Sequence, residues 1–143
     1  MKKIYFACAI SSGRDHADAY HEIVKIIKGQ GLHVLSDYFA DKTVEALKGP
    51  TPHLKPPQIW QDDVNMIKEA HAIIAEVTQP SLGVGYEIAI AHEWGKPVLA
   101  LYHPRPGHRL SSMIIGSPNV MVFEYKDVSE TVPVIADFIS QLG

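Results

Sequence analysis

The sequence has one cysteine, Cys8, among its 143 residues. A single thiol excludes an internal disulfide and any metal site that needs several cysteine ligands. The eight histidines show no HExxH motif or other metal-ligand spacing. No apolar run approaches the ~20 residues that cross a bilayer, and the first residues are typical of a strand rather than a signal peptide. We therefore expect a cytoplasmic protein with no metal site and no membrane partner.

The chain also lacks a surplus of basic residues. Thirteen Lys and Arg stand against 16 Asp and Glu, which gives a net charge of −3. This balance argues against nucleic acid as a partner, because duplex binding requires a positively charged surface. Apolar residues make up 46% of the chain and charged residues 20%, a mixture that can fill a core and excludes a disordered protein. We expect a single domain over residues 1–143.

Strand-like and helix-like apolar patterns alternate along the chain. Short apolar runs predict strands at residues 4–10, 33–35, 72–77, 98–102 and 120–125. Helical spacing predicts helices between 15 and 29, at 58–70, at about 85–94, at 111–115 (a short one) and over 132–139. Residues 36–57 are polar and proline-rich, which predicts a long loop.

This alternation predicts an α/β fold with a doubly wound, five-stranded parallel sheet. With five strands, the flavodoxin-like, Rossmann-like strand order 2-1-3-4-5 is the natural expectation. In that order the topological switch lies between strands 1 and 3. A ligand should therefore bind beside the loops at residues 9–15 and 78–86.

The loop after the third strand contains two glycines and a carboxylate. Gly83 and Gly85 let the backbone come close to a ligand, and the amides at the following helix start favour an anion. We expect Glu87 in the first turn of that helix, where the helix dipole keeps a carboxylate ionised. Glu87 is then a candidate nucleophile. Alternatively, it only stabilises the helix start.

A second carboxylate comes from the preceding helix. Asp63 shares a helix face with Ile59 and Ile67, whereas Asp62 lies on a more solvated face. A desolvated carboxylate has a raised pKa and can hold a proton near neutral pH. One ionised and one protonated carboxylate facing the same crevice is the pattern of a nucleophile and a general acid. The alternative is an acidic helix end with no chemistry.

The loop after the first strand is small and polar. Ser11, Gly13 and Arg14 could hold a phosphate through hydroxyl, amide and guanidinium groups, or form a plain helix-capping turn. The segment is neither a Walker A loop nor a G-x-G-x-x-G motif, so the sequence does not indicate a nucleoside triphosphate or a dinucleotide cofactor.

Several segments together resemble a known enzyme family. They are Ile4-Tyr5-Phe6, Gly13-Arg14, Asp63, the 13-residue run from Ala75 to Glu87, and Leu110-Ser111-Ser112-Met113-Ile114. This set resembles the Rcl family of 2′-deoxynucleoside 5′-monophosphate N-glycosidases, which are relatives of the nucleoside 2-deoxyribosyltransferases. The likeness extends from the first strand to the fifth.

The resemblance implies roles for the catalytic groups. Glu87 would attack C1′ of the deoxyribose while Asp63 assists departure of the base. Tyr5 would lie near the catalytic carboxylate and the sugar, and Ile10 would crowd the 2′ position. No metal or redox cofactor is implied.

The resemblance also implies how the 5′-phosphate is held. Ser81, the Gly83 region and Ser111 would bind it. Ser111 and Met113 would come from the other subunit of a homodimer.

Two positions separate this chain from its relatives. The transferases carry an acidic residue where this chain has Ser81, and a serine hydroxyl can donate to a phosphate that a carboxylate would repel. In contrast, Cys8-Ala9-Ile10-Ser11 stands where the family usually has Gly-Ser-Ile-Arg, so one hydroxyl and one guanidinium are missing. Either Arg14 compensates for the missing groups, or the phosphate is held more weakly. Two other functions stay open: transfer of the deoxyribosyl group to another base, and nucleotide binding without catalysis.

Overall fold

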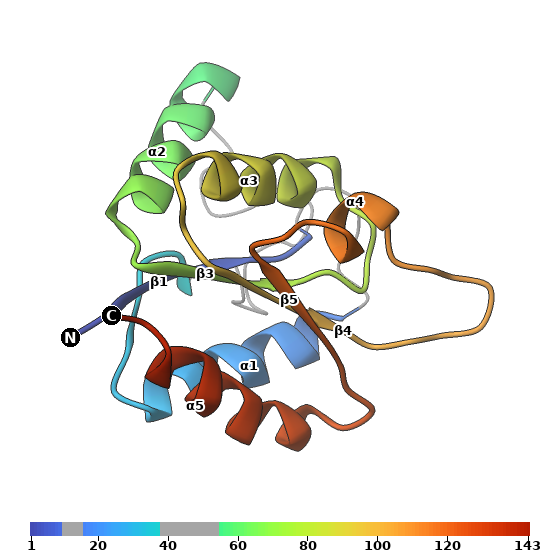
Figure 1. The fold of residues 1–143 in the computed structure, drawn as a ribbon. Helices are drawn as coiled ribbons and strands as arrows, with labels where there is room; N and C mark the ends of the chain where they lie inside the picture. Colours follow the sequence, from blue (N-terminus) through green and yellow to red (C-terminus); the bar gives the residue numbers. More distant parts are fainter. Residues whose placement is uncertain (10–15, 38–54) are drawn as a thin grey trace.

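The computed structural model describes residues 1–9, 16–37 and 55–143 (Figure 1). The elements follow one another as β1 (Lys3–Ala7), α1 (Ala17–Gly29), β2 (His33–Val34), α2 (Pro56–Glu69), β3 (Ala72–Glu76), α3 (Leu82–Glu93), β4 (Val98–Tyr102), α4 (Ser112–Ile115), β5 (Val120–Glu124), the 3-10 turn η2 (Val128–Glu130) and α5 (Thr131–Ser140).

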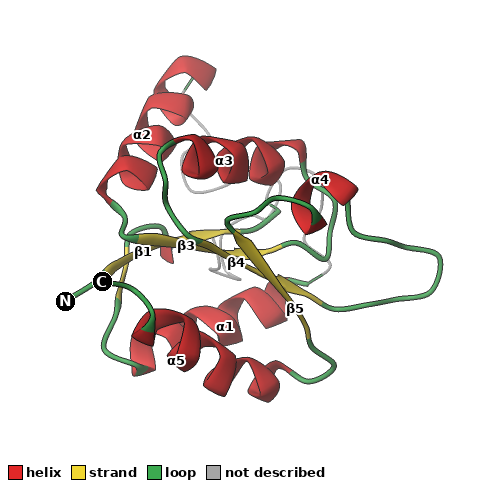
Figure 2. Cartoon of the chain, viewed as in Figure 1, coloured by secondary structure: helices red, strands yellow, loops and turns green. Residues whose placement is uncertain are grey.

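The five strands form one parallel sheet in the order β2-β1-β3-β4-β5. The predicted fold class and strand order are therefore confirmed. Figure 2 shows α2 and α3 on one face of the sheet and α1 and α5 on the other. A helix follows each of the first four strands and leads the chain to the next parallel strand, and the helices cover both faces of the sheet.

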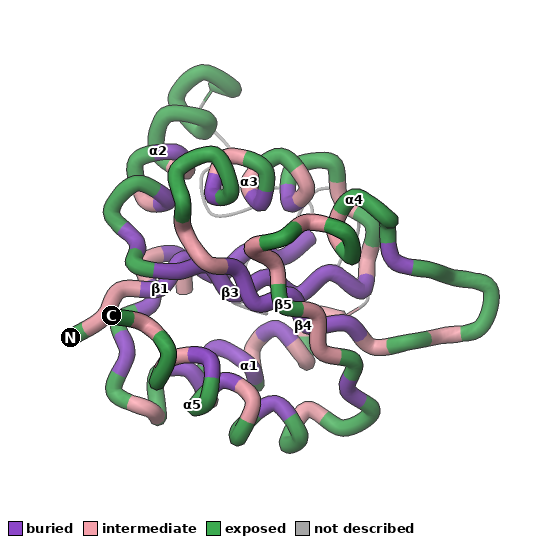
Figure 3. Tube along the Cα trace, viewed as in Figure 1, coloured by how far each residue is buried: buried purple, intermediate pink, exposed green. Residues whose placement is uncertain are grey.

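The core lies on both sides of the central strands. Every residue of β3 and β4 is buried, as Figure 3 shows by the continuous buried colour along these strands. On the lower face, α1 buries Tyr20, Ile23, Val24 and Ile27, the helical stripe that the sequence predicts. Full burial of one such aliphatic side chain contributes about 1.5–3 kcal/mol. None of the described helices combines the length and the apolar content that a bilayer crossing requires.

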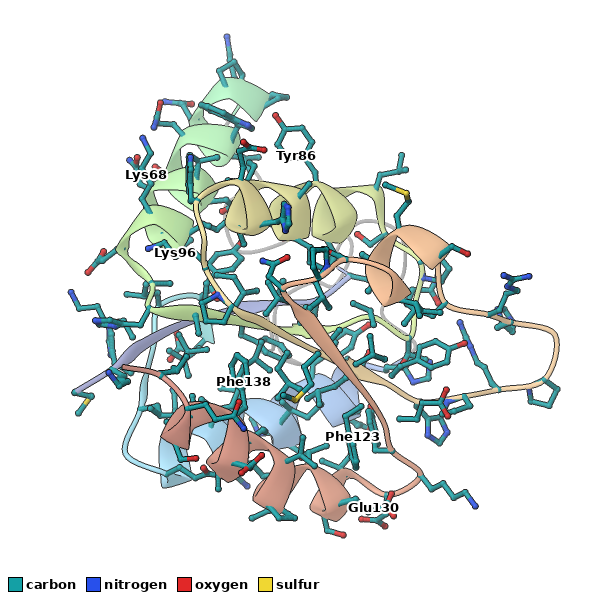
Figure 4. The ribbon with its side chains drawn as sticks, in the orientation of Figure 1. Lys68, Tyr86, Lys96, Phe123, Glu130 and Phe138 are labelled. Atoms are coloured by element: carbon teal, nitrogen blue, oxygen red, sulfur yellow. The ribbon has the colours of Figure 1, made fainter. Side chains whose placement is uncertain are left out.

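The ends of α2 are fixed by two different devices. Its first two residues are Pro56 and Pro57. Proline lacks a backbone N–H, and the N–H groups of a first helical turn have no intrahelical acceptor, so nothing is lost at these positions. At its other end, the Lys96 ammonium donates to the carbonyls of Lys68 and Ala70, at 2.7 and 2.6 Å (Figure 4). These contacts satisfy carbonyls that the helix leaves without intrahelical partners.

Several predicted boundaries are wrong, and one of them is the start of α2, at Pro56 rather than at residue 58. The first strand ends at Ala7 rather than at residue 10, and the second contains two residues rather than three. The helix α3 begins at Leu82, three residues before the expected start, and it ends near Gly95 as expected. Gly95 has a φ of +68°, which glycine adopts without strain and which turns the chain back toward β4.

Candidate active site

Three side chains from three elements meet on the α2–α3 face of the sheet. Tyr5 of β1 donates its hydroxyl hydrogen to Oε2 of Glu87 in α3, at 2.5 Å. The carboxyl group of Glu87 lies close enough to that of Asp63 in α2 for the two to share a hydrogen bond. The three predicted catalytic residues therefore lie in contact, although they are far apart in the sequence.

The alternation of β1 aims Tyr5 at this cluster. Its neighbour Phe6 packs edge-on against Tyr20 of α1, on the opposite face of the sheet. Successive strand residues point to opposite faces, so Tyr5 points toward α3. The Tyr5 side chain is completely buried, which holds its hydroxyl group in one direction.

Glu87 does not lie where the sequence analysis expects it. Because α3 begins at Leu82, Glu87 is in the second helical turn and not in the first. Loss of hydration raises the pKa of Glu87 to about 8; the Tyr5 hydroxyl opposes this shift, and the neighbouring Asp63 adds to it. The expectation that the helix dipole lowers this pKa is wrong, because dipole effects fade beyond the first turn.

Asp63 lies as the helical pattern predicts, at least relative to Asp62. Asp63 is partly buried and Asp62 is exposed. Loss of hydration raises the pKa of Asp63 to about 6; the charge of Asp62 adds to this shift, and the hydrogen bond with Glu87 opposes it. Ile59, expected on the same buried face, is 39% exposed, because the first half of α2 does not pack on the sheet.

The two carboxyl groups therefore behave as a pair that shares one proton near neutral pH. Two carboxyl groups in contact do not both ionise near neutral pH, because their negative charges would repel each other. The remaining proton is therefore bound by the pair and not by one residue alone. In this substrate-free arrangement Glu87 holds the proton more tightly than Asp63 does. This order is the reverse of the expected one, in which Glu87 is ionised and Asp63 carries the proton.

A groove of about 420 Å³ runs between α2 and α3 and opens onto this pair. Its walls are mainly apolar, and Trp60 donates its indole N–H to the Tyr86 hydroxyl across the two helices at 3.3 Å. Figure 4 shows Tyr86 on the part of α3 that faces α2. Besides the two carboxyl groups, the groove is lined by Pro56, Ile59, Trp60, Val64, Ile67, Leu82, Gly83, Tyr86 and Ile90.

Sequence reasoning missed Trp60 and Tyr86 as groove residues. Both are about half exposed, at 48% and 56%, and they are joined across the groove by the hydrogen bond described above. Tyr86 directly precedes Glu87, and Trp60 lies three residues before Asp63. Their positions beside the two carboxylates are the signal that could have identified them.

The predicted phosphate-binding serine caps α3. The Ser81 hydroxyl accepts a hydrogen bond from the Val84 N–H at 3.3 Å, which makes Ser81 the N-cap residue. Gly83 and Gly85 lie inside the first turns of α3 rather than in the preceding loop. A methyl group built at Gly85 would have no neighbour within 4 Å. The space beside Gly85 on the surface of α3 is therefore open.

Ser111 and Met113 lie at the predicted short helix. The Ser111 hydroxyl caps α4 by accepting from the Met113 N–H at 3.2 Å. The Met113 side chain is 82% exposed. No hydrogen bond or ion pair in the described part of the chain joins these two residues to the Glu87–Asp63 pair.

The remaining predicted site residues lie outside the described residues. These are Ile10, Ser11, Gly13 and Arg14, which lie between β1 and α1 in the sequence, and their roles stay predictions. Among residues 1–9, 16–37 and 55–143, no three His, Cys, Asp or Glu side chains gather closely enough to hold a metal ion.

Comparison with known proteins places the chain among enzymes of nucleosides and nucleotides. Residues 4–121 match the family model described as nucleoside 2-deoxyribosyltransferase. A Nematostella vectensis protein named as a 2′-deoxynucleoside 5′-phosphate N-hydrolase is 41% identical, covering 99% of this chain and 96% of its own length. The 5-hydroxymethyl-dUMP N-hydrolase of Rattus norvegicus is 39% identical, covering 89% and 77%.

A solved structure shares the fold. The CMP N-glycosidase of Clostridium botulinum superposes with a TM-score of 0.70 at 20% sequence identity. The match covers 96% of this chain and 99% of that one.

Replacing Glu87 with glutamine should stabilise the protein increasingly as the pH rises. The raised pKa means that the folded state keeps a proton that the unfolded state releases above its ordinary value of 4.5. The natural protein therefore loses stability between about pH 4.5 and 8, whereas the amide does not titrate. We expect the Tm advantage of Glu87→Gln to grow to several degrees across this range, as measured by calorimetry.

The matched control is Glu93→Gln, which changes an exposed carboxylate at the other end of the same helix. Its Tm difference from the natural protein should stay nearly constant with pH. A Glu87→Gln difference that is equally flat would contradict the raised pKa.

Proposed function

The chain belongs to the nucleoside 2-deoxyribosyltransferase family and is an N-glycosidase, and from this premise we propose that it hydrolyses 2′-deoxynucleoside 5′-monophosphates to free base and 2-deoxyribose 5-phosphate. The observation that carries the proposal is the contact of Tyr5, Glu87 and Asp63 beside an apolar groove. A pair of carboxyl groups with one proton suits cleavage of a glycosidic bond. The names of the two relatives support the nucleotide as substrate.

In the proposed first step, Glu87 attacks C1′ of the sugar. The pair's proton first moves across the hydrogen bond from Glu87 to Asp63, since only an ionised carboxylate is a nucleophile. The Tyr5 hydroxyl favours this ionised form by donating to Oε2. The C1′–N bond then breaks, Asp63 gives its proton to the departing base, and an ester joins C1′ to Glu87.

In the proposed second step, water opens this ester. Asp63, now ionised, accepts a proton from the water molecule, whose oxygen attacks C1′. The bond between C1′ and Glu87 breaks, and 2-deoxyribose 5-phosphate leaves. The pair ends with the same single proton with which it started.

The N-terminal end of α3 suits the 5′-phosphate. The first helical turn presents backbone N–H groups without intrahelical acceptors, and the helix dipole favours an anion there. The Ser81 hydroxyl at this end can donate to a phosphate oxygen. In the proposal the loop after β1, with Ser11, Gly13 and Arg14, completes the phosphate site.

We propose a homodimer in which Ser111 and Met113 reach the nucleotide of the partner subunit. Large apolar side chains are exposed on the elements concerned: Met113 at 82%, Ile115 at 58% and Leu82 at 97%. Exposed apolar side chains of this size are typical of an interface with another protein surface. Neither nucleic acid nor a membrane has a part in this proposal.

Transfer of the deoxyribosyl group to a second base is the alternative reaction. The family description favours it, and it would use the same ester on Glu87. Only the acceptor differs, which is water in one case and a base in the other. Incubation of a deoxynucleoside or its monophosphate with a second, labelled base separates the two reactions, because only transfer yields an exchanged product.

Removing either carboxyl group should stop or slow base release. We expect Glu87→Ala to release no detectable base from a panel of deoxynucleoside and ribonucleoside monophosphates, and Asp63→Asn to be slower by about 10²–10⁴-fold. The exposed neighbour provides the control, since Asp62→Asn should retain near-normal rates. Chromatography of the free base gives the rate. Mass spectrometry of the natural protein, quenched with acid during turnover, should find the sugar phosphate on the peptide that contains Glu87.

Near-normal turnover by Glu87→Ala would contradict its role as nucleophile. A non-catalytic nucleotide-binding protein would instead bind the monophosphates tightly without releasing base from any of them.

The pH dependence of kcat/KM should be bell-shaped, with limbs near pH 6 and pH 8. Below about 6, Asp63 gains a proton while Glu87 still holds its own, so no carboxylate can attack. Above about 8, the pair loses its last proton, so no acid can protonate the base. Initial rates of base release across pH 5–9.5 test this expectation. A rate that stays level through both limbs would contradict a catalytic pair with one proton.

Ser111→Ala should weaken the use of monophosphates more than the use of nucleosides. A lost hydrogen bond to a charged phosphate corresponds to about 1.5–3 kcal/mol, which would raise the KM for the monophosphate by about tenfold or more. Nucleosides lack the phosphate, so their KM should change little. Steady-state kinetics on one monophosphate and its matched nucleoside make the comparison, and equal effects would argue against phosphate binding by Ser111.

A further inference from the structure

Glu76 is an ionisable side chain in the middle of the core that the proposed mechanism does not use. It is the last residue of β3, the central strand in Figure 2, and its exposed fraction is zero. No Lys or Arg in the described part of the chain pairs with it. A carboxylate in this position is costly unless hydrogen-bond donors surround it.

Glu76 points away from the Tyr5–Glu87–Asp63 cluster. Ile74 of β3 pairs with Phe6 of β1, and Phe6 faces α1. Because side chains alternate along a strand, Glu76 shares the α1 face with Ile74, two residues earlier. The Glu76 carboxylate therefore lies beneath the sheet, whereas the cluster lies above it.

Three donors surround the Glu76 carboxylate. The Thr78 N–H donates to Oε1 at 2.7 Å, and the Thr78 hydroxyl donates to Oε2 at 2.9 Å. The Tyr125 hydroxyl donates to Oε2 as well. Burial, and then the charge of Glu76, raise the pKa of Tyr125, which keeps this phenol in its donating form.

These bonds join the ends of three neighbouring strands. The His103 N–H, directly after β4, donates to the Thr78 hydroxyl at 2.8 Å, which leaves the Thr78 hydrogen directed to Glu76. The His103 ring Nδ1 contacts the Tyr125 carbonyl, after β5, at 2.9 Å. Thr78 itself is 2% exposed. The loop after β3 is thus fixed at its second residue to β4 and β5.

That loop ends at Ser81, which caps α3 and begins the helix that carries Glu87. Only Gln79 and Pro80 separate Thr78 from Ser81. Arg105 adds a contact to the same short segment, since its guanidinium lies 3.2 Å from the Gln79 side-chain oxygen. A shift of Thr78 would therefore move the Ser81 hydroxyl and the first N–H groups of α3.

We propose that Glu76 is a positioning residue that, through Thr78, fixes Ser81 and the start of α3 where the 5′-phosphate of the substrate binds. The inference rests on the proposed function, because it assigns the phosphate to this end of α3. Glu76 itself touches no substrate and lies on the opposite face of the sheet. Its carboxylate is required because it can accept from all three donors at once, whereas a glutamine would direct its NH₂ group at one or two of them.

The test compares the kinetics of Glu76→Gln and two Thr78 variants with those of the natural protein. Thr78→Val removes the hydroxyl with little change in shape, and Thr78→Ser retains it. For Glu76→Gln and Thr78→Val, we expect the KM for a deoxynucleoside monophosphate to rise about tenfold, equivalent to about 1.4 kcal/mol, with kcat changed much less. Thr78→Ser should retain the natural KM.

This pattern distinguishes positioning from mere support of the fold. Partial unfolding lowers the amount of active enzyme and therefore the apparent kcat, whereas displacement of the phosphate site raises KM. Unchanged KM in folded Glu76→Gln and Thr78→Val would overturn the proposal. An equally raised KM in Thr78→Ser would also overturn it, because that variant retains the hydroxyl group.

A binding measurement keeps this inference separate from the proposed function. If the natural protein releases no base, the hydrolase proposal fails, and calorimetric titration with a deoxynucleoside monophosphate then provides the readout. A Kd about tenfold weaker in Glu76→Gln and Thr78→Val, but not in Thr78→Ser, supports the positioning role. Equal affinities in all four proteins, or no binding by any of them, overturn it.

Discussion

The contact between the carboxyl groups of Asp63 and Glu87 is the constraint on which the rest of the site depends. Two acids forced together where water is scarce keep one proton between them. The packing of α2 and α3 against the same face of the sheet imposes this contact. Tyr5 then donates to the member of the pair that the proposed reaction needs ionised.

The sheet separates two tasks onto its two faces. The α2–α3 face holds the carboxyl pair and the groove, and it leaves Trp60 and Tyr86 partly exposed at the entrance. The α1–α5 face holds the Glu76 network, in which the Thr78 N–H, the Thr78 hydroxyl and the Tyr125 hydroxyl all donate to the Glu76 carboxylate. A rigid, satisfied network is suited to fixing geometry, whereas a strained pair of acids is suited to chemistry. Within the described residues, the loop between Thr78 and Ser81 links the Glu76 network to the start of α3.

The fold could be predicted from the sequence because parallel strands that are buried on both faces appear as uninterrupted apolar runs. Element boundaries were harder to predict, and one error propagated into the chemistry. The sequence analysis places the start of this helix at about residue 85, and Gly83 and Gly85 have low helix propensity. The Ser81 cap and the packing of Val84 and Ile88 outweigh that preference. Glu87 therefore lies in the second turn and not in the first, and its pKa is raised where the sequence analysis expects it to be low.

Other features depend on partners that no local pattern contains. The helical spacing of Asp63 predicts its partial burial relative to Asp62, but its partner Glu87 is 24 residues away. Similarly, the sequence shows Glu76 only as a polar residue in an apolar strand, because its donor Tyr125 directly follows β5, a strand two places along the sheet. Tertiary contacts of this kind are fixed by topology and not by periodicity.

The length of α3 between Ser81 and Glu87 also bears on why a doubly charged phosphate is compatible with an acidic pair. Six residues of helix separate the two side chains by about 9 Å along the axis. A phosphate at the N-terminal end would thus lie beside backbone N–H groups and the positive end of the dipole, at a distance from the carboxylates. An acidic residue at position 81 would add repulsion at the anion itself, whereas a serine hydroxyl donates to it. The same helix can therefore hold an anion at its start and a nucleophile in its second turn.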